Sequence, residues 1–554
     1  MDAIVFGATG FVGRALVAEL LGRGQRVAAA VRTDTLTPWL AERGVATGGL
    51  NVVTADLTRP LTGLPQARDV YNAAARFAFG LGVEEARAVN VTGALHVLEW
   101  AATLPRLRRL VHISGYRVSG VRPDYARLGA YEASKAEADL AVHARARELG
   151  VPLTVANPST VIGPGQHLGL ASLVGDLWNG RLAALPGGPD VFLPVVTLDY
   201  FTRFLAEIPA APAGEDHWVL DDDTPPLPEL IGLVARHLGV RAPRRTIPVG
   251  LVRRLPRALT GADPETLSFL SSDRYPTASA RALAARAGLE MPPVADALRA
   301  WADDLVAARF GAATPCLRPY GFRDRTWVMG DARDPGHVLL HGLPVNADVW
   351  ARVAALLPGP VLAPDLPGLG RSAPSDRPVE AWLAGLMGGV RTRPTLVAHS
   401  LACGPALRFA VEHPERVGGL VLVAPAFLQA PASWAARSAV AAPLLRRMSA
   451  ARLAATLGVP EGPEVASAAL DLRRPGVARR VVAALRAASA ARDATRALLT
   501  RVRVPVEIVT GSADPLTADP GHPVTEIAGA GHYPQLTHPD QVARVLRRPV
   551  ASAR

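Results

Sequence analysis

The sequence predicts an α/β protein with two consecutive α/β domains, and two observations lead to this prediction. Short apolar segments alternate with longer amphipathic segments along the chain, which is the pattern of parallel strands joined by crossover helices. The composition changes between Gly311 and Gly336, where Gly, Pro, Arg and Asp follow one another with little periodicity. We therefore expect a first domain over residues 1–310, a linker with the start of the second domain over 311–335, and the second domain over 336–554.

Composition and charge exclude several classes of protein. The chain is 49% hydrophobic and 20% charged, so it can bury sizeable cores and is not disordered. The densest basic stretch, Arg473 to Arg503, contains no aromatic residue that could stack on bases, so we expect solvated helix faces and no nucleic-acid binding. The longest uncharged run, Val417 to Ala436, is interrupted by glycines and prolines, so we expect no membrane span.

The number of cysteines and the first residues of the chain indicate the cellular compartment in which we expect the protein. Cys316 and Cys403 lack the spacing of a metal site, and two cysteines fit a reducing compartment. The first expected strand begins at Ala3, which leaves no room for a signal peptide. We therefore expect a cytoplasmic protein without a metal ion.

The expected strand over residues 3–6 leads directly into a glycine-rich turn and then into an amphipathic helix. In that position a Gly-x-x-Gly-x-x-Gly turn lets the backbone approach a pyrophosphate, which lies against the N-terminus of the helix. The residues expected to contact this part of a dinucleotide are Gly7, Thr9, Gly10, Phe11, Val12 and Gly13.

The residue that follows the second expected strand, residues 26–31, is Arg32. An acidic residue at this place binds a free ribose 2′-hydroxyl, whereas an arginine suits a 2′-phosphate. The sequence therefore favours NADP(H) as the cofactor. NAD(H) is the alternative, because Asp34 lies two residues further on.

Lys135 is the only lysine among the 60 basic residues of the chain. It lies four residues after Tyr131 on an expected helix, so the two side chains share one face. Arginine can replace lysine on a charged surface. Its planar guanidinium does not replace a compact ammonium that must contact both a hydroxyl and a sugar. The position of the one lysine therefore indicates a functional site.

Further motifs follow the later strands and helices of the first half. They are Asp56-Leu57, Asn72-Ala73-Ala74-Ala75, Asn90-Val91-Thr92-Gly93, Ser114 and the stretch from Asn157-Pro158 to Gly165. With the glycine turn and the Tyr131/Lys135 pair, they resemble the extended branch of the short-chain dehydrogenase/reductase superfamily (the NAD-dependent epimerase/dehydratase family) over about residues 1–310. The last stretch is most similar to dihydroflavonol reductases and 3β-hydroxysteroid dehydrogenases. The resemblance implies a Rossmann-type doubly wound parallel sheet. Besides Tyr131 and Lys135, it implies cofactor contacts at Asp56, Leu57, Asn72, Ala73, Ala74 and Pro158.

By this resemblance, Tyr131 exchanges a proton with the substrate oxygen, and Lys135 lowers the pKa of Tyr131 and holds the nicotinamide ribose. Ser114 donates a hydrogen bond to the reacting carbonyl, and Asn90 orders a water that relays the proton. Both have a structural alternative, a strand-end cap for Ser114 and a helix cap for Asn90. A nucleotide-sugar epimerase shares these motifs, but the lobe expected over residues 165–310 shows no site for the nucleotide diphosphate.

The second half carries a nucleophile, an acid and a base, each placed after an expected strand. Ser400 lies on a tight strand-to-helix turn, and Asp514 and His532 follow later strands. This order along the chain resembles the α/β-hydrolase fold over about residues 330–548.

This resemblance implies that Ser400 is the nucleophile, His532 its base, and Asp514 the group that orients the histidine. The backbone N–H groups of Leu343 and Leu401 would form the oxyanion hole. A serine nucleophile indicates hydrolysis of an ester, thioester, lactone or C–C bond.

The nucleophile turn departs from the usual Gly-x-Ser-x-Gly pattern, because Ala398 and Ala402 stand at the two glycine positions. Each alanine adds only a methyl group, so we expect the turn to survive. The alternative is a domain kept for binding or stability. A helical Ala/Leu/Arg pattern over about residues 425–500 predicts a lid, and its apolar faces favour a substrate that is apolar in part.

The sequence therefore predicts a bifunctional enzyme, in which an NADP(H)-dependent carbonyl reductase or alcohol dehydrogenase is fused to a serine hydrolase, both acting on small molecules. One alternative is a nucleotide-sugar epimerase or dehydratase. Another is an NADPH-binding scaffold with a silent hydrolase domain. The resemblance also allows a homodimer through the first domain.

Replacing Arg32 by Asp should shift the cofactor preference from NADP(H) toward NAD(H). A charge-assisted contact to a phosphate contributes about 1.5–3 kcal/mol, so the ratio of the two affinities should change at least about tenfold. Fluorescence titration of both proteins with NADPH and NADH measures this ratio. Equal affinity of the wild-type protein for the two cofactors would contradict the assignment.

Overall fold

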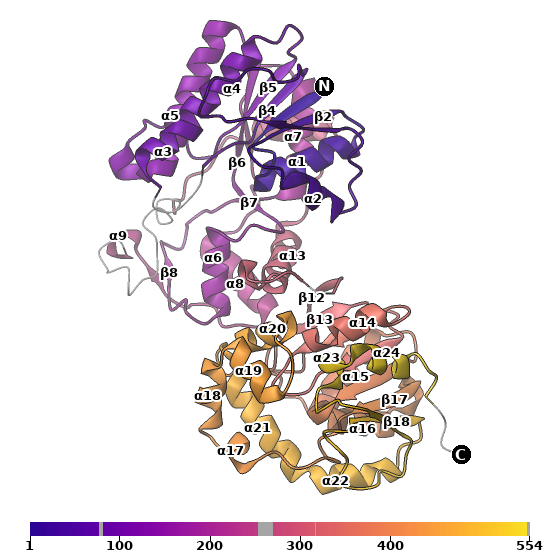
Figure 1. The fold of residues 1–554 in the computed structure, drawn as a ribbon. Coiled ribbons are helices and arrows are strands. Elements are labelled where there is room, and N and C mark those ends of the chain that lie inside the picture. The colour runs from indigo at the N-terminus through magenta and orange to yellow at the C-terminus, as the bar shows by residue number, and fades with distance from the viewer. Residues whose placement is uncertain (77–80, 253–269, 316, 551–554) are drawn as a thin grey trace. The chain divides into compact units, whose positions relative to one another are not determined.

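Figure 1 shows the computed structural model, which describes residues 1–76, 81–252, 270–315 and 317–550. Cys316 lies outside these residues. The chain divides into two compact units, each made of several segments. Unit 1 comprises Met1–Leu170, Ala183–Leu233 and Pro243–Trp301, and unit 2 comprises Ala171–Leu182, Val234–Ala242 and Ala302–Arg554.

Unit 1 is built on a parallel sheet with the strand order β10-β6-β5-β4-β1-β2-β3. Its strands are β1 (Ala3–Phe6), β2 (Val27–Val31), β3 (Leu50–Thr54), β4 (Asp69–Asn72), β5 (Arg109–Ile113), β6 (Leu153–Pro158) and β10 (His217–Val219). The chain runs outward from β1 to β3 and then returns to β4 beside β1. The strand order reverses there, and in such sheets ligands bind at the carboxyl ends of the strands at this reversal. The predicted Rossmann-type doubly wound sheet is confirmed.

Helices cover both faces of this sheet (Figure 1). They include α1 (Phe11–Gly22), α2 (Leu36–Ala41), α3 (Val83–Arg87), α4 (Gly93–Ala102), α5 (Tyr125–Leu149), α7 (Leu198–Glu207) and α12 (Ala278–Arg286). Successive residues of a strand point to opposite faces. Accordingly, Ala3 and Val5 of β1 pack in one core with α1, α2 and α7, while Ile4 and Phe6 pack in a second core with α4 and α5. Two small sheets accompany these elements: β7 (Thr160–Ile162) with β9 (Val195–Thr197), and β8 (Leu185–Pro186) with β11 (Thr246–Ile247).

Unit 2 is built on a mixed sheet with the strand order β12-β13-β15-β14-β16-β17-β18-β19. Its strands are β12 (Tyr320–Arg323), β13 (Thr326–Gly330), β14 (His337–Leu340), β15 (Val361–Pro364), β16 (Thr395–His399), β17 (Gly419–Val423), β18 (Val506–Gly511) and β19 (Val524–Ile527). Strand β13 is antiparallel to its neighbours β12 and β15, and the strands from β15 to β19 run parallel. The carboxyl ends of the parallel strands therefore meet at one edge.

Two groups of helices belong to this sheet. The sheet is flanked by α14 (Ala351–Leu356), α15 (Val379–Leu386), α16 (Cys403–Glu412), α23 (Pro534–Thr537) and α24 (Pro539–Leu546). Between β17 and β18 the chain forms α17 (Trp434–Arg437), α18 (Ala441–Arg447), α19 (Ala450–Leu457), α20 (Pro463–Leu472), α21 (Val477–Ala490) and α22 (Arg492–Ala497). No helix in the described ranges is both long and apolar enough to cross a membrane.

Residues from the first half of the sequence complete unit 2, through parts of α6 (Leu170–Trp178), α8 (Leu227–Leu238) and α13 (Val294–Ala307). The ring of Trp178 packs edge-on against Phe322, and the Arg474 guanidinium lies 3.5 Å from the centre of that indole. The sequence predicts a solvated face for Arg474. This is wrong, because the guanidinium is buried against Trp178 and donates to the Gly370 carbonyl oxygen.

Arg309, which follows α13, is buried in unit 2. Its guanidinium forms ion pairs with Asp471 of α20 and with Asp348, which lies 3.5 Å away. Both carboxylates are themselves buried. The segment that enters unit 2 is thus held to a helix more than 150 residues further along the chain by buried charges.

The Arg309→Met variant should lose about 3–5 kcal/mol of the free energy of unfolding, because two buried carboxylates would lose a cation. Urea denaturation followed by the fluorescence of the buried Trp327 and Trp350 reports on this unit. Arg391→Met is the matched control, because it removes a solvent-exposed ion pair with Asp334 and should cost at most about 1 kcal/mol. Equal losses in both variants would contradict this role of Arg309.

Candidate functional site

The nucleophile turn of unit 2 lies at the carboxyl end of β16. Ser400 adopts φ of +54°, a backbone conformation that costs energy for any residue with a Cβ. Ala398 and Ala402 beside it are fully buried, so the turn has room for a methyl group at each place but for little more. A Cβ built on Gly342 would lie 2.8 Å from the Cβ of Ser400, so the loop after β14 approaches the turn closely.

Three predicted residues meet in one chain of hydrogen bonds. Ser400 Oγ lies 2.7 Å from His532 Nε2, and His532 Nδ1 lies 2.6 Å from Asp514 Oδ2. The carboxylate accepts from Nδ1–H, which leaves Nε2 unprotonated and able to accept the hydroxyl proton of Ser400. These side chains follow β16, β18 and β19, which are parallel strands of one sheet, so their carboxyl ends lie at the same edge.

The loop after β14 carries one of the two predicted oxyanion donors. The backbone N–H of Leu366 donates to His341 Nε2 at 2.9 Å, so the proton of this imidazole is on Nδ1, which donates to the Gly342 carbonyl oxygen at 2.8 Å. Burial lowers the pKa of His341, which keeps the ring neutral. The Gly342 carbonyl and the Leu343 N–H belong to one trans peptide and point in opposite directions, so the histidine fixes the direction of that N–H.

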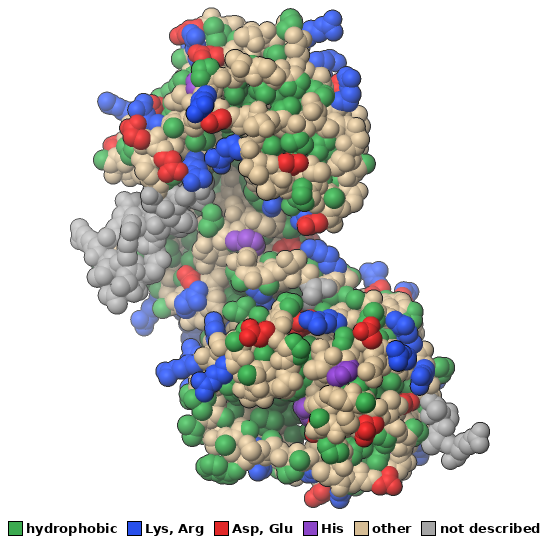
Figure 2. Space-filling model, in the orientation of Figure 1, with side chains coloured by type: hydrophobic (Ala, Val, Ile, Leu, Met, Phe, Trp, Pro, Cys, Tyr) green, Lys and Arg blue, Asp and Glu red, His purple; other side chains and the backbone are tan. Residues whose placement is uncertain are grey.

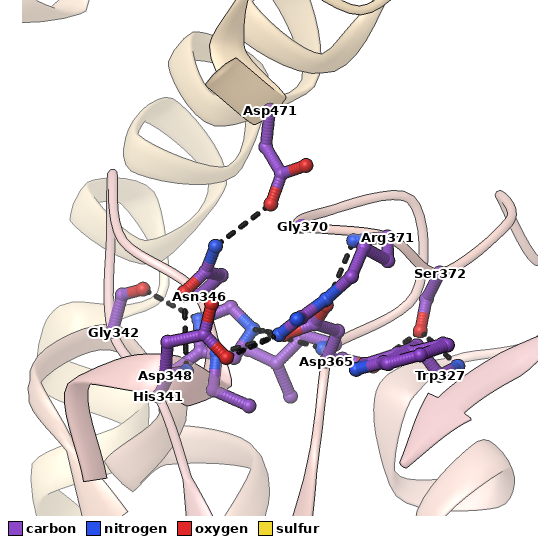
Figure 3. Close-up of polar contacts among 12 residues, drawn as sticks. Trp327, His341, Gly342, Asn346, Asp348, Asp365, Gly370, Arg371, Ser372 and Asp471 are labelled. Carbon is purple, nitrogen blue, oxygen red and sulfur yellow. Dashed lines mark hydrogen bonds and ion pairs between the residues drawn. The ribbon is translucent and has the colours of Figure 1, made fainter. Parts of the chain in front are cut away.

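A buried network of charges supports this loop (Figure 3). Asp365 accepts from the backbone N–H of Ala347 at 2.7 Å and from Arg371 Nε at 2.8 Å, and Arg371 Nη2 donates to Asp348 at 2.9 Å. Burial raises the pKa of Asp348, but Arg371 and Arg309 outweigh it and hold that pKa well below its usual range. The two arginines therefore favour the ionised form of Asp348.

A cavity of about 980 Å³ opens beside Ser400. It is lined by the three residues of the hydrogen-bond chain, by Leu343 and Leu401, and by apolar side chains of α17–α19 and α21. Figure 2 shows apolar side chains gathered around a hollow over these helices. The volume suits a small organic molecule, and the lining suits one that is largely apolar.

The glycine turn of unit 1 contains close approaches that require glycine. Gly7 has φ of +74°, and a Cβ at Gly13 would lie 2.1 Å from the Gly7 carbonyl oxygen. Helix α1 begins at Phe11, and its N-cap residue Gly10 provides no side-chain cap. The N–H groups of Phe11, Val12 and Gly13 therefore have no intrahelical acceptor and are available to an anion. The glycines allow the turn to pack closely on itself and on the segment after β4, and the N–H groups at the start of α1 fit a pyrophosphate.

The segment after β4 forms a second wall beside this turn. A Cβ at Gly7 would lie 2.6 Å from the backbone nitrogen of Ala74, so the segment Ala73–Ala74 touches the turn. The Asn72 side chain accepts from the Ala74 N–H at 3.2 Å and lies 3.2 Å from His112 Nδ1, which fixes this segment. Thr9, at the tip of the turn, is exposed.

Of the predicted residues after β2 and β3, Arg32 and Asp56 are exposed and Leu57 is partly buried. Arg32 directly follows β2. Asp34 accepts hydrogen bonds from the backbone N–H groups of Leu36 and Thr37, each at 3.0 Å, so it serves as the cap of α2. Asp56 accepts from the Thr58 hydroxyl, and the Leu57 carbonyl accepts from His96. Asp34 is engaged in this cap, whereas Arg32 is an exposed cation at the same edge of the sheet.

Helix α5 carries Tyr131 and Lys135 and is interrupted at Gly129, which has φ of +81°. Lys135 Nζ is buried and donates to the Ile113 carbonyl oxygen at 2.9 Å. Burial lowers the pKa of Lys135 to about 8. Burial, followed by the charge of Glu132, raises the pKa of Tyr131 to about 12.

Asn90 and Ser114 each lie beside a residue of α5, which is Ser134 for Asn90 and Asp139 for Ser114. Asn90 sits in a single π-helical turn, Ala88–Thr92, and donates to Ser134 Oγ at 2.9 Å while it accepts from the Arg76 N–H at 2.7 Å. It therefore joins α5 to the loop after β4. The Ser114 hydroxyl is buried at the end of β5, beside Asp139. Pro158, at the end of β6, accepts from the Tyr116 N–H at 3.2 Å.

Sequence reasoning missed Gln429 beside the hydrogen-bond chain of unit 2. Its Nε2 donates to both the backbone oxygen and Oδ2 of Asp514. This contact fixes the carboxylate that His532 uses. Residue 429 lies in the loop after β17, 85 positions before Asp514, and no motif marks it. Among the described residues, no cluster of three or more His, Cys, Asp or Glu could hold a metal ion.

Comparison with known proteins relates each half of the chain to a family. Residues 338–545 match the alpha/beta hydrolase family, and residues 3–180 match the NAD dependent epimerase/dehydratase family. A pimeloyl-[acyl-carrier protein] methyl ester esterase from Aromatoleum aromaticum is 30% identical over 251 residues, which are 38% of this chain and 96% of that protein.

Two further proteins are similar to parts of the chain. Sterol demethylase protein B from Methylococcus capsulatus is 30% identical over 213 residues, which are 35% of this chain and 62% of that protein, so the chain spans less than two thirds of it. The solved structure of a UDP-glucuronic acid 4-epimerase from Bacillus cereus in complex with NAD has 17% identity and a TM-score of 0.38. It covers 49% of this chain and 98% of that one.

Proposed function

We propose that this chain, which belongs to the alpha/beta hydrolase family through residues 338–545 and to the NAD dependent epimerase/dehydratase family through residues 3–180, is a bifunctional enzyme. One activity is the hydrolysis of an ester, thioester or lactone at Ser400. The other is an NADP(H)-dependent reduction of a carbonyl group, or its reversal, at Tyr131 and Lys135. The observation that carries the proposal is the hydrogen-bond chain from Ser400 through His532 to Asp514 at the edge of an apolar cavity.

In the hydrolase reaction, Ser400 Oγ attacks the substrate carbonyl carbon while its proton passes to His532 Nε2. The N–H groups of Leu343 and Leu401 stabilise the negative oxygen of the tetrahedral intermediate. Collapse expels the alcohol or thiol, which takes the proton from His532. A water then gives its proton to His532 and hydrolyses the acyl-enzyme, which restores Ser400. Asp514 stays charged and keeps the imidazole in the required tautomer.

The name of the esterase relative supports ester chemistry for this half. That relative is matched over 96% of its length, and its substrate is an acyl methyl ester. The apolar lining of the cavity agrees with an acyl chain. We therefore favour ester hydrolysis over C–C bond hydrolysis.

In the oxidoreductase half, a bound NADP(H) supplies or accepts the hydride. The N–H groups of Phe11, Val12 and Gly13 would hold its pyrophosphate, and Arg32 would bind its 2′-phosphate. The Tyr131 hydroxyl gives its proton to the substrate oxygen. The Lys135 ammonium, which donates to the Ile113 carbonyl oxygen, would hold the nicotinamide ribose beside Tyr131. Asn90 holds α5 at the correct distance from the loop after β4.

A nucleotide-sugar epimerase is the second candidate for the first half, because the matched family includes such enzymes. The two candidates differ in cofactor turnover. A reductase consumes NADPH in proportion to a ketone or aldehyde, whereas an epimerase leaves the cofactor concentration unchanged with a nucleotide sugar. The similarity to sterol demethylase protein B supports an apolar carbonyl or alcohol as the substrate.

A fluorophosphonate probe should label the full chain at Ser400, and p-nitrophenyl esters should be hydrolysed. Ser400→Ala should abolish labelling and lower kcat at least about 10³-fold, and adding His532→Ala should cause little further loss, because the residues act as a unit. Ser375→Ala, at an exposed position outside the cavity, is the control. A folded wild-type protein that is not labelled would instead support a silent hydrolase domain.

Lys135→Arg and Tyr131→Phe should each abolish NADPH oxidation by a carbonyl substrate, while Ser400→Ala should leave it unchanged. Since the pKa of Lys135 is about 8 and that of Tyr131 about 12, kcat/KM of the wild-type protein should fall as the pH rises through about 8, where Lys135 loses its proton. A spectrophotometric pH profile tests this. Near wild-type rates in both variants would refute the assignment.

A further inference from the structure

The cavity beside Ser400 contains few charged groups. Its titratable lining residues include Arg408, Arg492, Asp514 and His532. Arg408 already forms an ion pair with Glu380, and Asp514 is already hydrogen-bonded to His532. Arg492 differs from Arg408, because the described part of the chain gives it neutral partners and no ion pair with a carboxylate.

Arg492 is the first residue of α22. Its Nη1 donates to the Ala426 carbonyl oxygen at 2.9 Å, and its Nη2 lies 3.2 Å from Thr517 Oγ1. The Ala426 N–H donates in turn to the Ser400 carbonyl oxygen at 3.3 Å. Ala426 therefore connects the Arg492 guanidinium to the backbone of Ser400 through two hydrogen bonds. The cation is close enough to contact the same substrate molecule that Ser400 attacks.

Arg492 is half-buried beside the apolar lining of the cavity, and an anion that enters the cavity with the substrate can form charge-assisted hydrogen bonds with its guanidinium. A guanidinium has five N–H donors, and Ala426 and Thr517 use two of them. The remaining donors can bind the two oxygens of a carboxylate. A single positive charge matches a carboxylate, which has one negative charge, better than a phosphate, which has nearly two.

We propose that Arg492 binds a carboxylate at the far end of the hydrolase substrate. The substrate class is then an ester, thioester or lactone with an aliphatic segment and a second, free carboxylate, and the apolar lining of the cavity receives the aliphatic segment. This inference rests on the proposed hydrolase function and specifies the class of substrate that the Ser400 site would bind. Arg492 is a specificity-determining residue and takes no part in bond breaking.

The test measures binding in the Ser400→Ala background, in which the ligands are not consumed. Isothermal titration compares monoethyl adipate, which has one free carboxylate, with diethyl adipate, which has none. Monoethyl succinate and monoethyl suberate vary the distance between ester and carboxylate. Arg492→Gln should lower the affinity ratio of half-ester to diester at least about tenfold, because a charge-assisted contact is lost while an amide donor to Ala426 remains. Arg496→Gln, one turn further on α22 and outside the cavity, should leave the ratio unchanged.

A merely structural role for Arg492 would weaken half-ester and diester equally and leave the ratio unchanged, which would overturn the proposal. The absence of any preference of the Ser400→Ala protein for a half-ester would overturn it as well. Failure of the proposed hydrolase activity is a separate result, because it appears as absent fluorophosphonate labelling of the wild-type protein and does not affect the binding ratio.

Discussion

Asp365 is the group on which the hydrolase site of unit 2 depends. It is fully buried, and it is bonded to two loops at once, through the Ala347 N–H and through Arg371. Loss of these donors would leave a buried carboxylate without partners and would strongly destabilise the folded protein. The loops that carry Ala347 and Arg371 are therefore held in place. Gly370 reflects the same constraint, because a Cβ there would lie 2.5 Å from the Asp365 carboxyl carbon. Through Leu366 and His341, this arrangement reaches the peptide that precedes Leu343.

The two proposed sites occupy the same kind of position in their sheets. In each unit, parallel strands bring their carboxyl ends to a common edge, and the chemistry lies on the turns beyond those ends. Each site also requires a close backbone approach that only small residues allow, at Gly7 and Gly13 in unit 1 and at Gly342 beside Ser400 in unit 2. A ligand therefore meets N–H groups held by the fold rather than by flexible side chains, which limits the reorganisation needed on binding.

Much of this was predictable because its signals are local. The glycine turn, the Tyr131/Lys135 pair and the motifs that contain Ser400, Asp514 and His532 can each be recognised within a short segment of sequence. The predicted fold class and the predicted fusion of two families are confirmed. The contacts that were missed join distant segments. Gln429 reaches Asp514 and Arg309 reaches Asp471 only after folding, and no periodicity marks either pair. The solvated face predicted for Arg474 was wrong for the same reason, since Trp178 lies almost 300 residues away.

The contact between Trp178 and Arg474 has a consequence for how such a protein can be assembled by recombination. Residues 171–182 and 234–242 interrupt unit 1 in the sequence and yet pack as part of unit 2. A recombination crossover at any single point between Trp178 and Arg474 would therefore take these two side chains from different parent proteins. Exchange of the hydrolase half with that of another fusion protein would therefore preserve function only if the inserted segments of the first half were inherited with it.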